Sequence, residues 1–269
     1  MTEECIHGLE FDRCDLCSPK AVTKPARAAT ARAPRTSIAR AASPTRAARP
    51  TQLKKPLIIG EQRIHHLTHI DNLAGILSGG VHADASPNWD SRPEVDISSA
   101  DTREARRTTA VAGTVHTVAD YVPFFLSPNA ALWEGIRART PDPRISATAR
   151  GLPSAEFVLL VSTIKQIAEA LPAGSTVVTD GDAADPRTRF AATGDDSERM
   201  LRRLLGADDP GALQRAEFLV QGSVPFELFS LIGVANDKAR SAVRAILASS
   251  GHGPRLAVHP PWFALPDAE

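Results

Sequence analysis

Several residue types and patterns are scarce or missing in this chain of 269 residues. No apolar run is long enough to cross a bilayer, and the polar N-terminus is unlike a secretory signal peptide. These two absences predict a soluble, cytoplasmic protein. All three cysteines precede residue 18, so the rest of the chain offers no thiol nucleophile, and their odd number argues against a disulfide framework.

Motifs of the commonest nucleotide-binding and hydrolytic enzymes are also missing. The segment GILSGG at 75–80 is not followed by the Gly-Lys-Ser/Thr of a P-loop. There is no H-E-x-x-H, no G-x-S-x-G and no G-x-G-x-x-G after an expected strand. The sequence therefore argues against P-loop NTPases, zincin proteases, α/β-hydrolases and Rossmann-type dehydrogenases.

Acidic residues are absent from positions 18–56, which hold ten Lys or Arg. The net charge of the whole chain is nevertheless zero, so a cationic segment adjoins a mildly acidic remainder. This segment consists mainly of Ala, Pro, Arg, Thr and Ser, and it has too few large apolar side chains to offset the entropy of ordering. We expect a disordered basic linker, which serves either as a charged tether or as a weak contact with nucleic acid.

The first 17 residues contain a compact set of metal-ligand side chains. Cys5, His7, Cys14 and Cys17 follow the pattern C-x-H-x6-C-x2-C. Three thiolates and one imidazole are the donor set of a closed, tetrahedral structural zinc site. A mobile tail with incidental thiols is the alternative, but the clustering of every cysteine with a histidine favours a zinc-knuckle-like segment.

The remaining residues, 57–269, alternate irregularly between strand-like and helix-like patterns, which predicts an α+β domain. Residues 83–115 are polar and predict a long loop, a feature that compact domains seldom keep without a functional use. The expected strands are 63–68, 121–127, 155–162, 175–179, 216–222, 229–235 and 255–260, and the expected helices are 70–80, 163–171, 196–206 and 236–247.

Two glutamates stand in the same tripeptide, Ala-Glu-Phe, within apolar runs at Glu156 and Glu217. Strand alternation lets Glu217 face a cleft, but the local pattern does not distinguish it from Glu156. In the first expected strand, the same alternation places His66 and Thr68 on one face. Of the arginines in the loop, we expect Arg106 to be a solvated charge.

Taken in order, these segments resemble the DarT family of toxins, which are NAD-dependent ADP-ribosyltransferases acting on single-stranded DNA. The segments are RIHHLTHIDNLAGILSGG, the loop arginines, ADYVPFFLSP, VVTDGDA and RAEFLVQGSVPFELFSLIGV, and the resemblance spans about 63–263. It implies an ADP-ribosyltransferase-like split mixed β-sheet with flanking helices and an NAD cleft. It also implies NAD as substrate, single-stranded DNA as target and a macrodomain antitoxin that removes the modification.

The resemblance also assigns roles to residues. The family's catalytic glutamate has the sequence context of Glu217, which leaves Glu156 as scaffold. The family's first-strand pair that holds the NAD ribose corresponds to His66 and Thr68, and a further NAD contact corresponds to Asn72. The family's catalytic arginine, which also holds phosphate, corresponds to Arg103, with Arg107 as the alternative.

Three positions depart from the family's pattern. His65 and Phe125 replace an aromatic residue and a tyrosine, and Asp182 replaces a histidine that is common in thymidine-modifying members. The base that is modified therefore stays open. Two further hypotheses remain: a transferase acting on RNA or protein, and a catalytically dead, zinc-anchored nucleic-acid-binding module. The presence of His66, Thr68 and Glu217 argues against the second.

Overall fold

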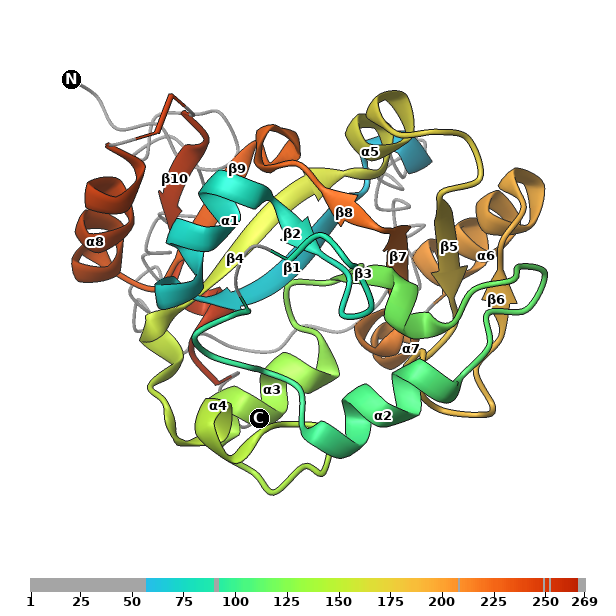
Figure 1. Cartoon of the computed structure of the whole chain (residues 1–269), viewed down its shortest axis with the longest axis horizontal. Helices are drawn as coiled ribbons and strands as arrows, with labels where there is room; N and C mark the ends of the chain where they lie inside the picture. Colours follow the sequence, from blue (N-terminus) through green and yellow to red (C-terminus); the bar gives the residue numbers. More distant parts are fainter. Residues whose placement is uncertain (1–56, 90–91, 208, 249, 252, 266–269) are drawn as a thin grey trace, which may run out of the picture. The chain divides into compact units, whose positions relative to one another are not determined.

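The computed structural model describes residues 57–89, 92–207, 209–248, 250–251 and 253–265 (Figure 1). The four expected zinc ligands and the basic segment 18–56 lie outside these residues. None of the helices within the described ranges is long and apolar enough to span a membrane.

A mixed eight-stranded sheet organises the fold, in the order β10-β9-β4-β1-β3-β7-β5-β6. Only the β10–β9 pair is parallel among these neighbours. The predicted α+β class, with a mixed sheet and flanking helices, is confirmed. The strands are β1 (Arg63–His69), β3 (Tyr121–Phe125), β4 (Phe157–Thr163), β5 (Thr176–Thr179), β6 (Phe190–Ala191), β7 (Glu217–Gln221), β9 (Leu231–Val234) and β10 (Arg255–Val258).

The sheet divides between its two central strands. β1 pairs with β4 along all seven of its residues, but it pairs with β3 only at His65 and Phe125. The side chain of Gln62 donates a hydrogen bond to the Leu126 carbonyl, which closes the narrow end of the division. From that end the two strands diverge, and the space between them opens into the cavity described below.

A second, two-stranded sheet pairs β2 (Val81–His82) with β8 (Ser223–Val224). Gly80, immediately before β2, has φ 80°, and a Cβ there would lie 2.6 Å from the Val224 carbonyl oxygen. Only glycine fits both the conformation and this close approach. The same Gly80 caps the end of the first helix, as the Gly79-Gly80 pair in the sequence predicts.

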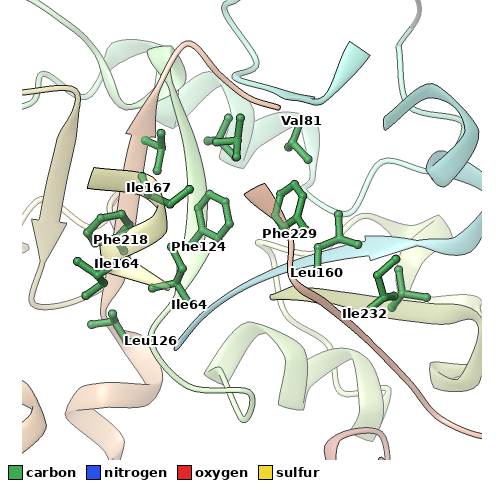
Figure 2. Close-up of a cluster of buried hydrophobic side chains, with 14 of the residues drawn as sticks. Ile64, Val81, Phe124, Leu126, Leu160, Ile164, Ile167, Phe218, Phe229 and Ile232 are labelled. Carbon is green, nitrogen blue, oxygen red and sulfur yellow. The ribbon is translucent and has the colours of Figure 1, made fainter. Parts of the chain in front are cut away.

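Helices flank the sheet (Figure 1), and apolar side chains from both sheet halves form a common core (Figure 2). In the core, Phe124 of β3 stacks on Phe229, which lies between β8 and β9. The α-helices are α1 (Leu73–Gly79), α2 (Ala100–Thr108), α3 (Ala131–Ala138), α4 (Ala147–Gly151), α5 (Ile164–Ala170), α6 (Gly194–Gly206), α7 (Pro210–Arg215) and α8 (Asp237–Leu247).

Two expectations about local structure are wrong. Residues 83–115 are not a loop throughout, because α2 lies within them. Ser99, the N-cap residue before this helix, accepts a hydrogen bond from the Thr102 N–H. Glu156 is not a strand residue, because it ends a 3₁₀ turn (Ser154–Glu156) just before β4.

Candidate active site

Two adjoining cavities open beside the divided sheet. The larger has a volume of about 440 Å³ and the smaller about 60 Å³. The larger cavity is within the range of small-molecule and cofactor sites. Residues that line both cavities are Ser98, Arg106, Pro123, Phe125 and Leu132.

Glu217 lines the smaller cavity as the first residue of β7, and it is only 4% exposed. Its Oε1 accepts a hydrogen bond of 3.0 Å from the Ala183 N–H, and its backbone N–H donates to the Thr179 hydroxyl. Burial raises the pKa of Glu217; the positive charge of Arg106 opposes that rise, and the negative charge of Asp182 adds to it. The result is a fixed carboxyl group with an increased affinity for a proton.

Arg106 is the arginine that contacts this carboxylate. Its Nη1 donates to Glu217 Oε2 at 3.2 Å, and the two side chains are 13% and 6% exposed. The expectation that Arg106 is a solvated charge is therefore wrong. Its Nη2 is buried and has no hydrogen-bond partner among the described residues. Because Arg106 lines both cavities, this N–H group is a free donor at the junction between them.

The other two arginines of α2 contact different carboxylates. Arg103 lines the larger cavity and donates to Asp96 at 2.5 Å. Arg107 donates to Asp84 at 2.6 Å and lines neither cavity. Neither residue is hydrogen-bonded to Glu217, so the structure brings Arg106, rather than the two residues expected from the sequence, to the glutamate.

His66 lines the larger cavity in a defined tautomer. Its Nδ1 lies 2.9 Å from the Pro123 carbonyl oxygen, which can only accept, so Nδ1 carries the proton. Burial lowers the pKa of His66, and the bond to Pro123 opposes that shift. The neutral ring leaves Nε2 as an acceptor suited to a ligand hydroxyl or N–H group.

Thr68 and Asn72 line the same cavity and are joined to each other. The Asn72 amide donates to the Thr68 hydroxyl and to the Val95 carbonyl, and its oxygen accepts from the Val95 N–H. Both amide protons of Asn72 are thus used within the protein. Asn72 therefore fastens the segment around Val95 to the cavity wall, and the Thr68 hydroxyl keeps a proton to donate.

Two residues considered from the sequence lie elsewhere. His65 is buried on the opposite face of β1 with its ring edge-on to Trp262, and burial lowers its pKa to about 4. It is a neutral core residue. Glu156 is about half exposed, lies 3.6 Å from the His69 Nε2 atom and lines neither cavity.

Several lining residues were not expected from the sequence. The Trp89 ring contacts both the His82 ring and the Arg92 guanidinium at one wall of the larger cavity. The sequence around these residues is polar and has no periodic pattern, so it gives no indication that they line a binding site. Within the described part of the chain, no group of three or more His, Cys, Asp or Glu residues is arranged to hold a metal ion.

Comparison with known proteins identifies relatives of this arrangement. The family model described as "ssDNA thymidine ADP-ribosyltransferase, DarT" matches residues 65–264. A DNA ADP-ribosyl transferase of Mycobacterium tuberculosis is 27% identical over 216 residues, covering 74% of this chain and 88% of its own. One from Thermus aquaticus is 28% identical over 208 residues, with the same two coverages.

Among solved structures, the chain is similar to the Thermus sp. 2.9 DarT in complex with ADP-ribosylated ssDNA. The TM-score is 0.62 with 25% identity, and the match covers 76% of this chain and 96% of that one.

Proposed function

Because the chain belongs to the DarT family of ssDNA thymidine ADP-ribosyltransferases, we propose that it transfers ADP-ribose from NAD to a base in single-stranded DNA and releases nicotinamide. One observation carries the proposal: the buried Glu217–Arg106 pair lies where a ligand-sized cavity meets a smaller one. The larger cavity is suited to the donor, and the smaller one, which Glu217 lines, marks the side from which the base attacks.

The donor cavity offers groups for the ribose and diphosphate parts of NAD. The His66 Nε2 and the Thr68 hydroxyl suit ribose hydroxyls, and Arg103 supplies positive charge for the diphosphate. Asn72 supports this wall through Val95. The free N–H of Arg106 suits an oxygen of the ribose or of the adjacent phosphate.

Glu217 and Arg106 are the proposed catalytic residues. As the bond between ribose and nicotinamide breaks, nicotinamide leaves with the electron pair and positive charge develops on the ribose, which the Glu217 carboxylate stabilises. A ring nitrogen of the base attacks the ribose carbon and loses its proton to Glu217. The raised pKa of Glu217 favours that proton transfer. We propose Arg106 instead of Arg103 or Arg107 for the arginine of this pair, since it alone is hydrogen-bonded to Glu217 among the three.

Unpaired DNA is the favoured target, because the attacking ring nitrogen of a base in a duplex is occupied by pairing. The Thermus sp. 2.9 relative was solved with ADP-ribosylated ssDNA, and the family description names thymidine. Thymidine is therefore the acceptor to test first.

The test is incubation with NAD and single-stranded oligonucleotides that each contain one type of target base, followed by mass measurement. The proposal expects one ADP-ribose added to an oligonucleotide and an equal amount of nicotinamide released. Addition to RNA or to protein alone would support the alternative target classes. If the folded protein yields neither an ADP-ribosylated target nor nicotinamide, the catalytically dead nucleic-acid-binding module is the remaining hypothesis.

The N-terminal region has its own proposed roles. We propose that residues 1–17 bind a structural zinc ion through Cys5, His7, Cys14 and Cys17, that 18–56 link them to the transferase unit, and that this unit begins at residue 57. The support is the ligand spacing and the composition of the sequence. As partners we propose single-stranded DNA and a macrodomain antitoxin in the cytoplasm; the resemblance to the family's toxins supports the antitoxin.

A further inference from the structure

The loop after β5 holds the Glu217 carboxylate. The Ala183 N–H of this loop donates to Oε1 at 3.0 Å. Asp182, the preceding residue, has its Oδ1 hydrogen-bonded to the Ala184 N–H and its Oδ2 to a distant arginine, Arg144. The position of the Ala183 N–H, and with it the orientation of the carboxylate, therefore depends on how Asp182 is held.

Arg144, in the segment between α3 and α4, holds Asp182. Its Nη1 donates to Asp182 Oδ2 at 2.9 Å, while its Nε and Nη2 bind both carboxylate oxygens of Asp142. These contacts raise the pKa of Arg144 and lower that of Asp142. A planar guanidinium fixed by a fork of this kind has little freedom to rotate.

The backbone of Arg144 contacts the N-terminus of α2, the helix that carries Arg106. Its carbonyl oxygen accepts a hydrogen bond of 2.9 Å from the Ser99 N–H, and the Ser99 hydroxyl donates to the Pro143 carbonyl at 2.7 Å. Ser99 is the N-cap of α2, the helix that carries Arg106. One residue thus joins the loop that orients Glu217 to the helix that supplies its arginine.

We propose that Arg144 is a positioning residue, which fixes the relative placement of Glu217 and Arg106 by joining Asp182 to the N-terminus of α2. It acts through these groups, and its own side chain lines the smaller cavity beside Glu217. The inference deepens the proposed function and rests on it.

The charges near Glu217 make the pH dependence of the rate a useful measurement, because a general loss of structure would not shift it in a set direction. Arg106 faces Glu217 from α2 and Asp182 faces it from the loop after β5. The same cavity is bordered by Arg144 and by Arg215 at the end of α7. The negative charge of Asp182 raises the pKa of Glu217, and Arg144 neutralises that charge. Loss of Arg144 should raise the pKa of Glu217 further, whereas loss of the Asp182 charge should lower it.

The experiment compares Arg144→Gln, Asp182→Asn and a matched control in the full chain. The control is Arg187→Gln, because Arg187 makes the same fork with Asp185, also two residues earlier, but at the surface. Transfer to a single-stranded oligonucleotide is measured across pH, together with the KM for NAD and the thermal midpoint.

For Arg144→Gln we expect kcat to fall between about 10-fold and 100-fold, the effect of displacing a catalytic group by a fraction of an ångström to 1 Å. The KM for NAD should stay within about 2-fold, since Arg144 does not line the larger cavity. The acidic limb of the rate profile should move to higher pH for Arg144→Gln and to lower pH for Asp182→Asn. Arg187→Gln should match the wild type.

A folded Arg144→Gln protein with the wild-type rate and pH profile overturns the proposal, as does a loss equal to that of Arg187→Gln. If Arg144→Gln does not fold, Arg144→Lys decides: lysine keeps the positive charge but cannot make the fork, so a wild-type kcat overturns the proposal and a lowered kcat with an unmoved acidic limb supports it. The wild type serves as the separate reference: absence of transfer by the folded wild type refutes the proposed function itself, whereas transfer retained in Glu217→Gln refutes only the catalytic role of Glu217.

Discussion

Replacement of Arg106 by glutamine tests whether the Glu217–Arg106 pair is a buried, mutually dependent ion pair. The two side chains are 13% and 6% exposed, so the variant leaves a nearly dry carboxylate without its counter-ion. Breaking one side of such a pair costs about 3–5 kcal/mol. Glu217 can take up a proton instead, and its pKa is already raised by burial, so we expect the low end, about 3 kcal/mol.

A loss of about 3 kcal/mol lowers the melting temperature of a domain this size by roughly 6–12 °C. The double variant Arg106→Gln/Glu217→Gln should recover most of this loss, because a neutral amide replaces the unpaired charge and can still accept the Ala183 N–H. Arg103→Gln is the matched control on the same helix. Its pair with Asp96 is 32% and 46% exposed, and its loss should cost less than about 1 kcal/mol.

Calorimetry or urea denaturation at pH 7 measures five proteins: the wild type, Arg106→Gln, Glu217→Gln, the double variant and Arg103→Gln. An Arg106→Gln midpoint within about 1 °C of the wild type would refute the buried pair. So would a double variant as unstable as the sum of its two single variants, because additivity means that the side chains do not interact.

Three further predictions concern separate parts of the chain. Glu217 has a folded-state pKa above its unfolded value, so its contribution to stability is lost as pH rises through the folded pKa. The stability of Glu217→Gln relative to the wild type should therefore be greater at pH 8 than at pH 5. A pH-independent difference contradicts this. Purified protein should carry about one zinc ion, lost in Cys14→Ser with activity retained, and metal analysis that finds none under reducing conditions removes the site. Deletion of 1–56 should flatten the dependence of log DNA affinity on log salt by about 3, if four phosphate contacts are lost. Equal slopes would make the basic segment a tether only.

The strands and most core helices could be predicted because burial imposes a period on the sequence. β4 is buried at six consecutive positions, and its apolar run is visible without any structure. Helix α8 buries Ala239, Val243 and Leu247 at helical spacing. The shorter elements β2, β6 and β8 have two residues each, too few to show a period.

Helix α2 escaped prediction for a physical reason. It buries none of its residues, so it lacks the apolar stripe on which periodicity depends. Its signals are a Ser99 cap, an acid in the first turn and bases in the last turn. Once the helix is known, Arg103 and Arg106 fall on one face, but only tertiary packing decides that Arg106 reaches the glutamate.

The choice between the two glutamates also depended on information outside the local sequence. Glu156 and Glu217 share the Ala-Glu-Phe context, yet one ends an exposed turn and the other begins a buried strand. The difference lies in distant partners: Thr179 and Ala183 hold Glu217. The likeness to a known family, rather than strand alternation, pointed to Glu217.

The most direct test of the proposed function is transfer by three proteins under one set of conditions: wild type, Glu217→Gln and Glu156→Gln, each with NAD and a single-stranded oligonucleotide. Mass measurement should find one added ADP-ribose with the wild type and with Glu156→Gln. With Glu217→Gln the rate should fall on the order of 100-fold or more, the cost of removing a charge-stabilising group from a transition state. Equal losses in the two folded variants, or full activity in Glu217→Gln, would contradict the assignment of the catalytic site.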